Sequence, residues 1–265
     1  MNTNSNTYTV IYSTVLVVVV AAVLAFAAMS LQPKQNENIK KETISQVLVA
    51  AAQSDENVTI AADADVMKLY TEMAADAFYV NGKGEKVGQM DLGKENVNNI
   101  QVVSTAELKK QNDIIKKIEA GQSELLETLQ LPVYVIDVNG KAVNVIPCYG
   151  AGLWGPIWGY LAVAADGKTL AGAVFDHKGE TPGLGAKITE DFFESQFIGK
   201  MFGEGDTKFD VVKGGANGAS NGVDAISGAT ITSQALGKTI NTWAKYYDSY
   251  LKSLGQIETS NSVEE

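Results

Sequence analysis

A run of small and hydroxyl-bearing residues ends just before the last predicted helix and is the first place where this sequence could do chemistry. It reads DAISGAT over residues 224–230, and Thr232 and Ser233 follow it. Free amide groups at the start of a helix attract an anion such as phosphate, and hydroxyl side chains can cap the same amides. The run therefore predicts either a seat for a phosphate-bearing ligand or an ordinary helix cap, and general physics favours the cap.

A second loop, residues 177–187, contains more glycine than a simple connection needs. It reads HKGETPGLGAK and joins the last predicted strand to a predicted helix start at 188–193. Gly183 and Gly185 permit backbone conformations closed to other residues and let a ligand approach closely, while Pro182 stiffens the loop. The loop predicts a seat for something flat or bulky, and a tight surface turn explains the composition equally well.

The rest of the composition excludes several classes of site and partner. The chain of 265 residues contains one cysteine, Cys148, and one histidine, His177. An intrachain disulfide is therefore impossible, and zinc, c-type haem and cysteine-ligated iron–sulfur sites are disfavoured. No glycine fingerprint for NADH follows a predicted strand. The formal net charge of -10 at pH 7 disfavours binding to nucleic acid.

The amino-terminal region contains an uncharged, apolar segment from residue 9 to residue 31. Its length is what a helix needs to cross the hydrocarbon core of a bilayer. A cleaved signal peptide is the competing interpretation, but residues 1–8 lack a basic region and the apolar run is longer than in most such peptides. We therefore predict an uncleaved anchor. By the positive-inside rule, Lys34, Lys40 and Lys41 weakly favour a cytoplasmic position for the rest of the chain.

The elements that follow the anchor are predicted mainly from hydrophobic periodicity. Pro33 and its polar neighbours indicate a linker, after which apolar residues recur at helical spacing. The predicted helices cover residues 38–53, 65–78 and 105–120. The pattern breaks into short pieces over 79–103, and 121–129 forms a short segment that Pro132 should end.

From residue 132 the periodicity becomes that of strands. Two apolar runs flank Asn139-Gly140, the strongest hairpin signal in the chain. A second hairpin is predicted from residues 158–164 and 169–176, so that 132–176 forms an antiparallel sheet. The last helix is predicted over 233–254, with one face that should pack on the core. That face comprises Leu236, Ile240, Trp243, Tyr247 and Leu251. The predicted fold class is α+β, an antiparallel sheet with flanking helices on a single N-terminal transmembrane helix.

Three motifs together resemble a known family. The run at 224–230 is similar to the recognition sequence of the periplasmic flavin transferases, which move FMN from FAD onto its final threonine. With GLW at 152–154 and ETPGLG at 180–185, the chain resembles the C subunit of the bacterial sodium-translocating NADH:quinone oxidoreductase over essentially its whole length. The related G subunit of the Rnf complex shares the threonine motif, but the other two motifs are more similar to the quinone reductase family.

The resemblance implies a set of site residues. Thr230 would carry FMN covalently as a phosphoester, and Asp224 would belong to the transferase recognition sequence. The further residues of the cofactor site would be Ser227, Gly228, Ala229, Glu180, Thr181, Gly183, Leu184, Gly185 and Trp154. An unassisted alcohol is a poor nucleophile, so a transferase must activate Thr230. We expect no catalytic side chain and no metal ligand, because the flavin supplies the redox chemistry.

The pattern of elements gives a domain plan, in which the resemblance identifies the FMN-binding part. Residues 1–8 would be a tail and 9–31 the transmembrane helix. Residues 32–131 would form the linker, neck helices and a peripheral layer. The FMN-binding domain would occupy 132–254, followed by a C-terminal tail at 255–265.

The implied function is that of a one-electron carrier in a membrane complex that oxidises NADH, reduces quinone and exports sodium ions. Partner subunits would supply electrons from an iron–sulfur centre, and the B subunit would accept them on a second FMN. The span contains no ionisable residue, so other chains must line any sodium path. The resemblance places this single-pass chain in the inner membrane with its large domain in the periplasm, where the transferase works, and it outweighs the weak lysine signal.

Two alternatives remain open at this point. The first is an Rnf-type subunit of a ferredoxin:NAD electron-transport complex. The second is a membrane-tethered binding module that uses the Gly183–Gly185 loop for another ligand and never carries flavin.

Overall fold

The computed structural model describes residues 6–205 and 207–261. The chain divides into two compact units, Met1–Glu42 and Thr43–Glu265. Helix α1 (Asn6–Ala52) makes up the described part of the first unit and ends in the second.

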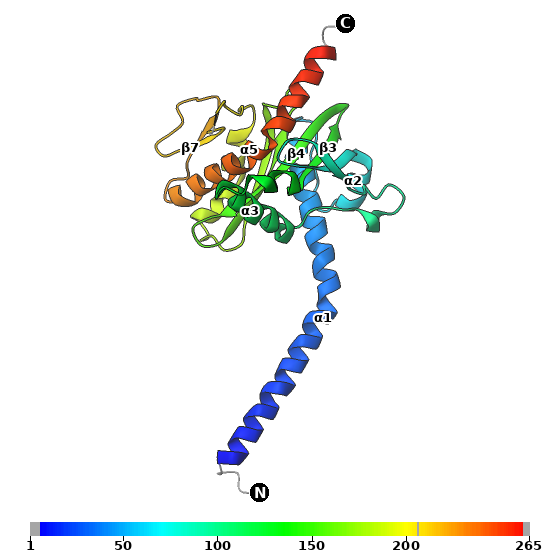
Figure 1. Cartoon of the computed structure of the whole chain (residues 1–265), viewed down its shortest axis with the longest axis vertical. Coiled ribbons are helices and arrows are strands. Elements are labelled where there is room, and N and C mark those ends of the chain that lie inside the picture. The colour runs from blue at the N-terminus through cyan, green and yellow to red at the C-terminus, as the bar shows by residue number, and fades with distance from the viewer. Residues whose placement is uncertain (1–5, 206, 262–265) are drawn as a thin grey trace. The chain divides into compact units, whose positions relative to one another are not determined.

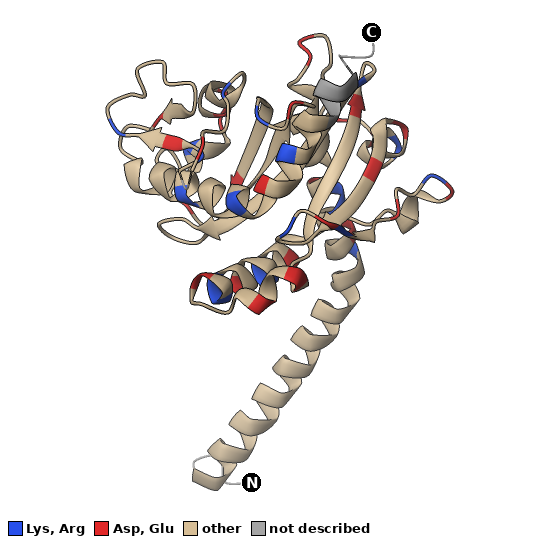
Figure 2. Cartoon of the chain, turned by 45° about the horizontal axis from the view of Figure 1, so that its top comes forward, with Lys and Arg blue, Asp and Glu red and all other residues tan. Residues whose placement is uncertain are grey.

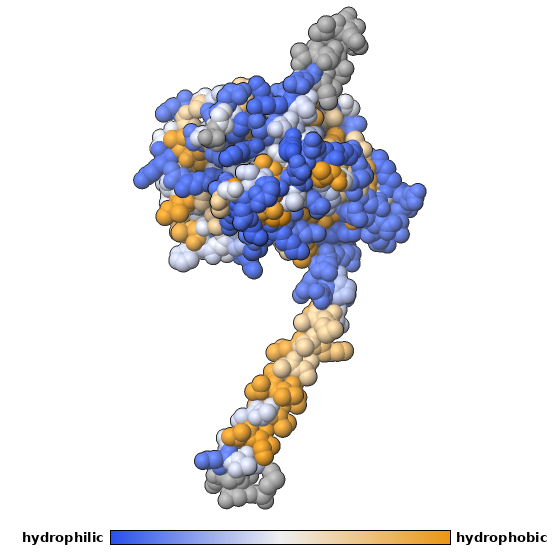
Figure 3. Space-filling view, viewed as in Figure 1, coloured by the Kyte–Doolittle hydropathy of each residue, from blue (hydrophilic) through white to orange (hydrophobic). Residues whose placement is uncertain are grey.

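The apolar part of α1 is long enough, by length and composition, to cross a membrane. Its side chains are exposed along this stretch, and the same stretch carries no charged residue (Figures 2 and 3). The prediction of a non-helical linker after the anchor is wrong, because the chain around Pro33 belongs to one continuous helix. Good helix formers surround the proline, and Lys41 pairs with Glu37 one turn away at 2.7 Å, which favours continuation of the helix.

The second unit is an α+β fold built around a six-stranded antiparallel sheet, which confirms the predicted fold class. The strand order is β2-β1-β3-β4-β5-β6. The strands are β1 (Ala74–Val80), β2 (Lys86–Gln89), β3 (Leu131–Val138), β4 (Lys141–Ala151), β5 (Pro156–Val163) and β6 (Leu170–His177).

Both predicted hairpins are confirmed. Asn139 and Gly140 join β3 to β4 with φ angles of 54° and 81°, the pair of positive values that a type I′ turn requires. Asp137 accepts a hydrogen bond from the Gly140 amide at 2.6 Å and stabilises this turn. In the β5–β6 connection, the Asp166 carboxylate accepts from the amides of Lys168 and Thr169.

The predicted helix over 65–78 is wrong in its second half. Helix α2 (Val66–Met73) stops before this region, and residues 74–80 form strand β1. Strand β1 pairs with β3 on one side and with β2 on the other, so tertiary pairing satisfies the backbone that a longer helix would have satisfied locally. Two strands of the sheet therefore come from the region expected to form a peripheral layer.

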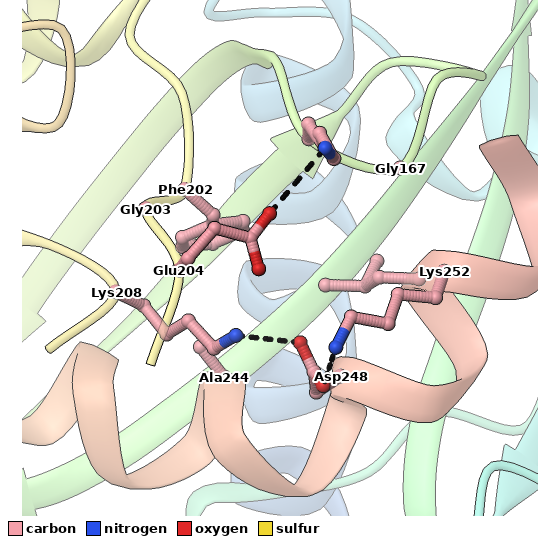
Figure 4. A pocket seen from close by; sticks show the side chains of 10 residues that line it. Gly167, Phe202, Gly203, Glu204, Lys208, Ala244, Asp248 and Lys252 are labelled. Carbon is pink, nitrogen blue, oxygen red and sulfur yellow. Dashed lines mark hydrogen bonds and ion pairs between the residues drawn. The ribbon is translucent and has the colours of Figure 1, made fainter. Parts of the chain in front are cut away.

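Helices cover both faces of the sheet. Helix α3 (Thr105–Glu119) and helix α5 (Thr230–Asn261) pack against β4. The last turns of α1 lie on the other face, behind the strands in Figure 4, where the Ala173 amide of β6 donates to Gln53 Oε1 at 2.8 Å. Figure 1 shows α3 and α5 in front of the same strands.

Helix α5 presents its predicted apolar stripe to the core, since all five residues of the stripe are buried. Two of them also make polar contacts with the sheet. Trp243 Nε1 donates to the carbonyl oxygen of Tyr149 in β4 at 2.7 Å, and the Tyr247 hydroxyl donates to that of Pro132 in β3 at 2.7 Å. The helix starts at Thr230, three residues before the predicted start, and continues to Asn261, so that 255–261 is helical where a tail was expected.

The remaining elements are short. They are η1 (Val97–Asn99), η2 (Ser123–Thr128), η3 (Gly185–Thr189), α4 (Asp191–Glu194), η4 (Ser195–Phe197), β7 (Asp210–Val212) and β8 (Gly222–Asp224). Strands β7 and β8 form a separate parallel pair that leads into α5. Helix α3 matches its prediction and begins with a capping box between Ser104 and Glu107. The expected amino-terminal tail, residues 1–8, is wrong for residues 6–8, which belong to α1. The rest of the two expected tails, residues 1–5 and 262–265, lies outside the described residues.

Candidate functional site

The three sequence motifs meet at one cavity of about 290 Å³. One wall comes from the loop between β4 and β5, another from the loop that follows β6, and the third from the start of α5. The lining residues are Leu153, Trp154, Glu180, Thr181, Leu184, Gly185, Gly228, Ala229, Thr230, Ile231 and Thr232. A cavity of this size is close to the lower end of the range for small-molecule sites.

The β4–β5 loop is a tight turn that presents an aromatic side chain. The Gly152 amide donates to the Gly155 carbonyl oxygen at 2.7 Å, which closes the turn. Trp154, at its tip, is 69% exposed. An indole with this much exposure has a flat apolar surface free for a ligand or a partner.

The loop after β6 is held at its base and folded on itself. The Lys178 amide donates to the Pro156 carbonyl oxygen at 2.9 Å, which keeps the loop beside β5. The Thr181 carbonyl oxygen accepts from the Leu184 and Ala186 amides at 3.1 and 3.2 Å. Gly183 has a φ of 76°, a conformation that favours glycine, and no Cβ at that position would meet a neighbour.

The start of α5 is organised by Ser233. Its hydroxyl donates to the Ala229 carbonyl oxygen at 2.9 Å and accepts from the Ile226 amide at 3.1 Å. The amides of Thr230, Ile231 and Thr232 have no acceptor within the described residues. These amides are the free donors with which a helix start binds an anion.

The two threonines beside the cavity differ in what their hydroxyls contact. Thr232 is 1% exposed, and its hydroxyl donates to Glu180 Oε2 at 2.7 Å. Thr230 is half-buried, and its hydroxyl has no hydrogen-bond partner in the part of the chain that the structure describes. The hydroxyl available to a ligand in this cavity is therefore that of Thr230.

Most of the site residues predicted from the sequence line the cavity, and three do not. Ser227 and Gly183 lie next to lining residues without being part of the wall. Asp224 is exposed at the end of β8, where its Oδ1 accepts from the Ala216 amide at 2.6 Å and its own amide donates to Gln196 Oε1 at 2.9 Å.

Three lining residues were not predicted as site residues, namely Leu153, Ile231 and Thr232. Leu153 belongs to the GLW motif, and the other two directly follow Thr230. Because these residues lie within or directly beside the motifs, extending each predicted site to its neighbours in the sequence would have included them.

A second hollow, of about 20 Å³, lies between α5, the β5–β6 turn at Gly167 and the segments that carry Phe202 and Lys208 (Figure 4). Two lysines close it by pairing with one aspartate on α5: Lys208 Nζ lies 2.6 Å from Asp248 Oδ1, and Lys252 Nζ lies 2.7 Å from Asp248 Oδ2. The carboxylate and the cations satisfy one another, and the space holds no more than a water molecule, so this hollow is a structural contact.

The single thiol is not a reactive group. Cys148 is fully buried in β4, and burial raises its pKa to about 12. Because the thiolate is the reactive form, this cysteine is inert at neutral pH. Within the described residues, no group of three or more His, Cys, Asp and Glu side chains is placed to hold a metal ion.

Comparison with known proteins gives a consistent result. The family described as FMN-binding domain matches residues 152–245, which run from the GLW motif into α5. The C subunit of the Na(+)-translocating NADH-quinone reductase of Vibrio vulnificus is 27% identical over 237 residues, covering 86% of each chain. The corresponding protein of Neisseria meningitidis serogroup A is 28% identical over 88% of this chain and 89% of its own.

Solved structures agree with these relatives. The crystal structure of the same C subunit from Parabacteroides distasonis superposes with a TM-score of 0.63 and 32% identity, covering 83% of this chain and 96% of that one. Shewanella oneidensis NqrC superposes with a TM-score of 0.59 and 25% identity, covering 82% of this chain and 98% of that one.

Proposed function

This chain belongs to the family of the C subunits of Na⁺-translocating NADH-quinone reductases, and from this premise we propose that it carries FMN bound covalently to Thr230. The bond is a phosphoester between the threonine hydroxyl and the FMN phosphate. The chain passes electrons one at a time between partner subunits of a membrane complex that oxidises NADH, reduces quinone and exports sodium ions.

The observation that carries the proposal is the environment of Thr230. Thr230 lines the cavity with a hydroxyl that has no partner among the described residues, and its own amide and the next two, at the start of α5, have no acceptor there either. A phosphate joined to this hydroxyl accepts hydrogen bonds from those amides and benefits from the positive end of the helix dipole. The residues present therefore fit the phosphate end of FMN.

The other walls fit the flat end of the cofactor. Leu184 and Trp154 offer exposed apolar surface on opposite loops, and Gly228 leaves the backbone of the attachment motif accessible. A Cβ at Gly228 would lie 3.3 Å from Leu184 Cδ2 and would tighten the entrance. When bound, the flavin supplies reversible electron transfer, and these side chains hold its ring and limit its contact with water.

The family also supports a location and a maturation route. We propose that α1 anchors the chain in the inner membrane by one span and that the domain containing the site, residues 132–254 together with β1 and β2, lies in the periplasm. A flavin transferase in that compartment loads Thr230, and Asp224 forms part of the sequence that it recognises. Electrons arrive from an iron–sulfur centre of partner subunits and leave to a flavin-carrying chain. The relatives favour quinone reduction over the Rnf-type alternative.

Flavin attachment is tested by producing the full chain together with a flavin transferase and viewing a denaturing gel under ultraviolet light. The wild-type band fluoresces, Thr230→Ala loses the fluorescence, and Thr232→Val keeps it after exhaustive labelling. Thr232→Val is the matched control because it removes the neighbouring hydroxyl and leaves Thr230 in place. A non-fluorescent wild-type band would favour the tethered binding module, and a fluorescent Thr230→Ala band would refute the site.

The orientation is tested separately with a reporter fused at the carboxyl terminus. A reporter enzyme that folds only in the periplasm should be active in this fusion. Activity of a reporter that works only in the cytoplasm would overturn the periplasmic assignment.

A further inference from the structure

The carboxylate of Glu180 lies where the three walls of the cavity meet. Glu180 is only 4% exposed, and each of its oxygens accepts a hydrogen bond from a different wall. Oε1 accepts from the Trp154 amide at 2.9 Å, and Oε2 accepts from the Thr232 hydroxyl at 2.7 Å. Since a carboxylate without a proton is a pure acceptor, both contacts match its chemistry. One side chain thus joins the β4–β5 loop, the loop after β6 and the start of α5.

Two glycines make room for this carboxylate. A Cβ at Gly152 would lie 2.5 Å from Glu180 Oε1. A Cβ at Gly185 would collide with Glu180 Oε2 and would lie 2.8 Å from Thr232 Oγ1. Any larger residue at either position must displace the carboxylate. The absence of a side chain at these two glycines therefore allows Glu180 to make its hydrogen bonds.

The backbone of Glu180 is also tied to the end of β6. Its amide donates to His177 Nδ1 at 3.2 Å. The contact places Glu180 at a defined distance from the last strand of the sheet. The carboxylate is therefore held from both its backbone and its side chain, as a positioning group should be.

We propose that Glu180 is a positioning residue for flavin attachment: it engages the Thr232 hydroxyl in a hydrogen bond and holds the Trp154 loop in place, so that the Thr230 hydroxyl alone is left to react. The inference rests on the proposed function of Thr230. In the attachment step, Thr230 Oγ forms a bond to the FMN phosphorus of FAD, the pyrophosphate bond breaks, and AMP leaves. The threonine proton passes to a base of the transferase, and no oxidation or reduction occurs.

Position matters in this step because the attacking oxygen must be aligned with the bond that breaks. Without the Glu180 contacts, the Thr232 hydroxyl is free to rotate and the Trp154 loop is no longer held beside it. A displacement of about 1 Å at a reacting group can slow a reaction by about 100-fold. We expect Glu180→Ala to lower the initial rate of flavin transfer by about 10-fold to 100-fold.

The test measures that initial rate on the full chain, purified in detergent, with FAD and a flavin transferase. Mass spectrometry of the labelled peptide assigns the flavin to Thr230 or Thr232. The variants are Glu180→Ala, Glu180→Gln and, as matched control, Glu190→Ala, which removes an exposed carboxylate from the same segment. Glu180→Ala should be slow and should place some flavin on Thr232. The control should behave as wild type.

Glu180→Gln separates positioning from a general loss of packing. Its amide oxygen can accept from the Trp154 amide, and its amino group can donate to the Thr232 hydroxyl, so both contacts survive without the charge. We expect the rate of Glu180→Gln to return to within about threefold of wild type. A Glu180→Gln variant as slow as Glu180→Ala would overturn the positioning role.

A double-mutant cycle shows whether Glu180 acts through Thr232. Thr232→Val removes the same hydrogen bond from the other side, and it should slow the transfer to Thr230. Adding Thr232→Val to Glu180→Ala should slow it by less than the product of the two single effects. If the two effects simply multiply, Glu180 does not act through Thr232. If Glu180→Ala does not fold, the rate measured for Thr232→Val alone still tests the hydrogen bond between the two residues.

Failure of the inference differs from failure of the proposed function. If wild type acquires no flavin on Thr230, the proposed function fails. If wild type is labelled on Thr230 and Glu180→Ala is labelled there at the same rate, the function stands and the role of Glu180 is refuted.

Discussion

A buried carboxyl outside the cavity should make the stability of the domain depend on pH. Glu194, at the end of α4, is 6% exposed, and its Oε1 accepts from the Phe175 amide of β6 at 2.6 Å. Burial raises the pKa of this carboxyl from 4.5 to about 7, and the nearby charges of Asp191 and Asp176 act in the same direction against the opposing hydrogen bond. Glu194 therefore holds a proton in the folded state under conditions in which the unfolded chain has lost it.

The sign and size of the effect follow from this difference. Below about pH 4.5 both states carry the proton, and the stabilisation is fully present. As the pH rises through 7, the folded state must ionise a buried carboxyl, and the stabilisation is lost. A pKa moved from 4.5 to about 7 corresponds to about 3 kcal/mol of unfolding free energy.

Glu194→Gln tests this reasoning because the amide oxygen can still accept from Phe175 and carries no charge. At pH 8 the variant should be more stable than wild type by about 3 kcal/mol, which corresponds to a rise in Tm of about 6–12 °C for a domain of this size. At pH 4.5 the two proteins should melt within about 2 °C of each other.

The assay is thermal unfolding followed by circular dichroism on the purified chain at both pH values. Glu190→Gln is the control, because that side chain is exposed and its loss should change Tm equally little at both. Comparing each variant with wild type at the same pH cancels the contributions of other carboxyls. A Glu194→Gln variant without a Tm gain at pH 8, or with the same gain at pH 4.5, would refute the assignment.

Three further substitutions have expected outcomes. Gly185→Ala should cost about 1–3 kcal/mol in thermal unfolding and slow flavin attachment, because its Cβ collides with the buried carboxylate of Glu180. Trp243→Phe should lower the urea unfolding free energy by about 1–3 kcal/mol, because it removes the buried hydrogen bond to the Tyr149 carbonyl oxygen. Gly140→Ala should lower the urea unfolding free energy by about 1–2 kcal/mol, because alanine is strained at a φ of 81°. No steric clash contributes, since no atom lies within 4 Å of the added Cβ.

Features that depend on near neighbours in the chain could be predicted well. The Asn139-Gly140 turn is set by the backbone freedom of two adjacent residues, and the structure contains it at the expected position. The buried stripe of α5 follows from helical spacing alone. The family, with its FMN-binding domain, could be identified because its motifs are short and contiguous.

Strand β1 shows where local pattern fails. Residues 74–78 carry apolar spacing that suits a helix, but the hydrogen bonds of this segment go to β3 and β2. Strand β3 begins more than fifty residues later in the chain. No local periodicity reports such a partner, because strand pairing depends on contacts that are distant in sequence.

The candidate site divides in the same way. The threonine motif is a contiguous run, so the sequence by itself was enough to propose Thr230 as the attachment point. The sequence could not show that the Thr232 hydroxyl is held by a hydrogen bond, nor that its acceptor is the carboxylate of Glu180. Folding decides both, because it brings an acceptor 52 positions away to the Thr232 hydroxyl and leaves that of Thr230 without a partner among the described residues.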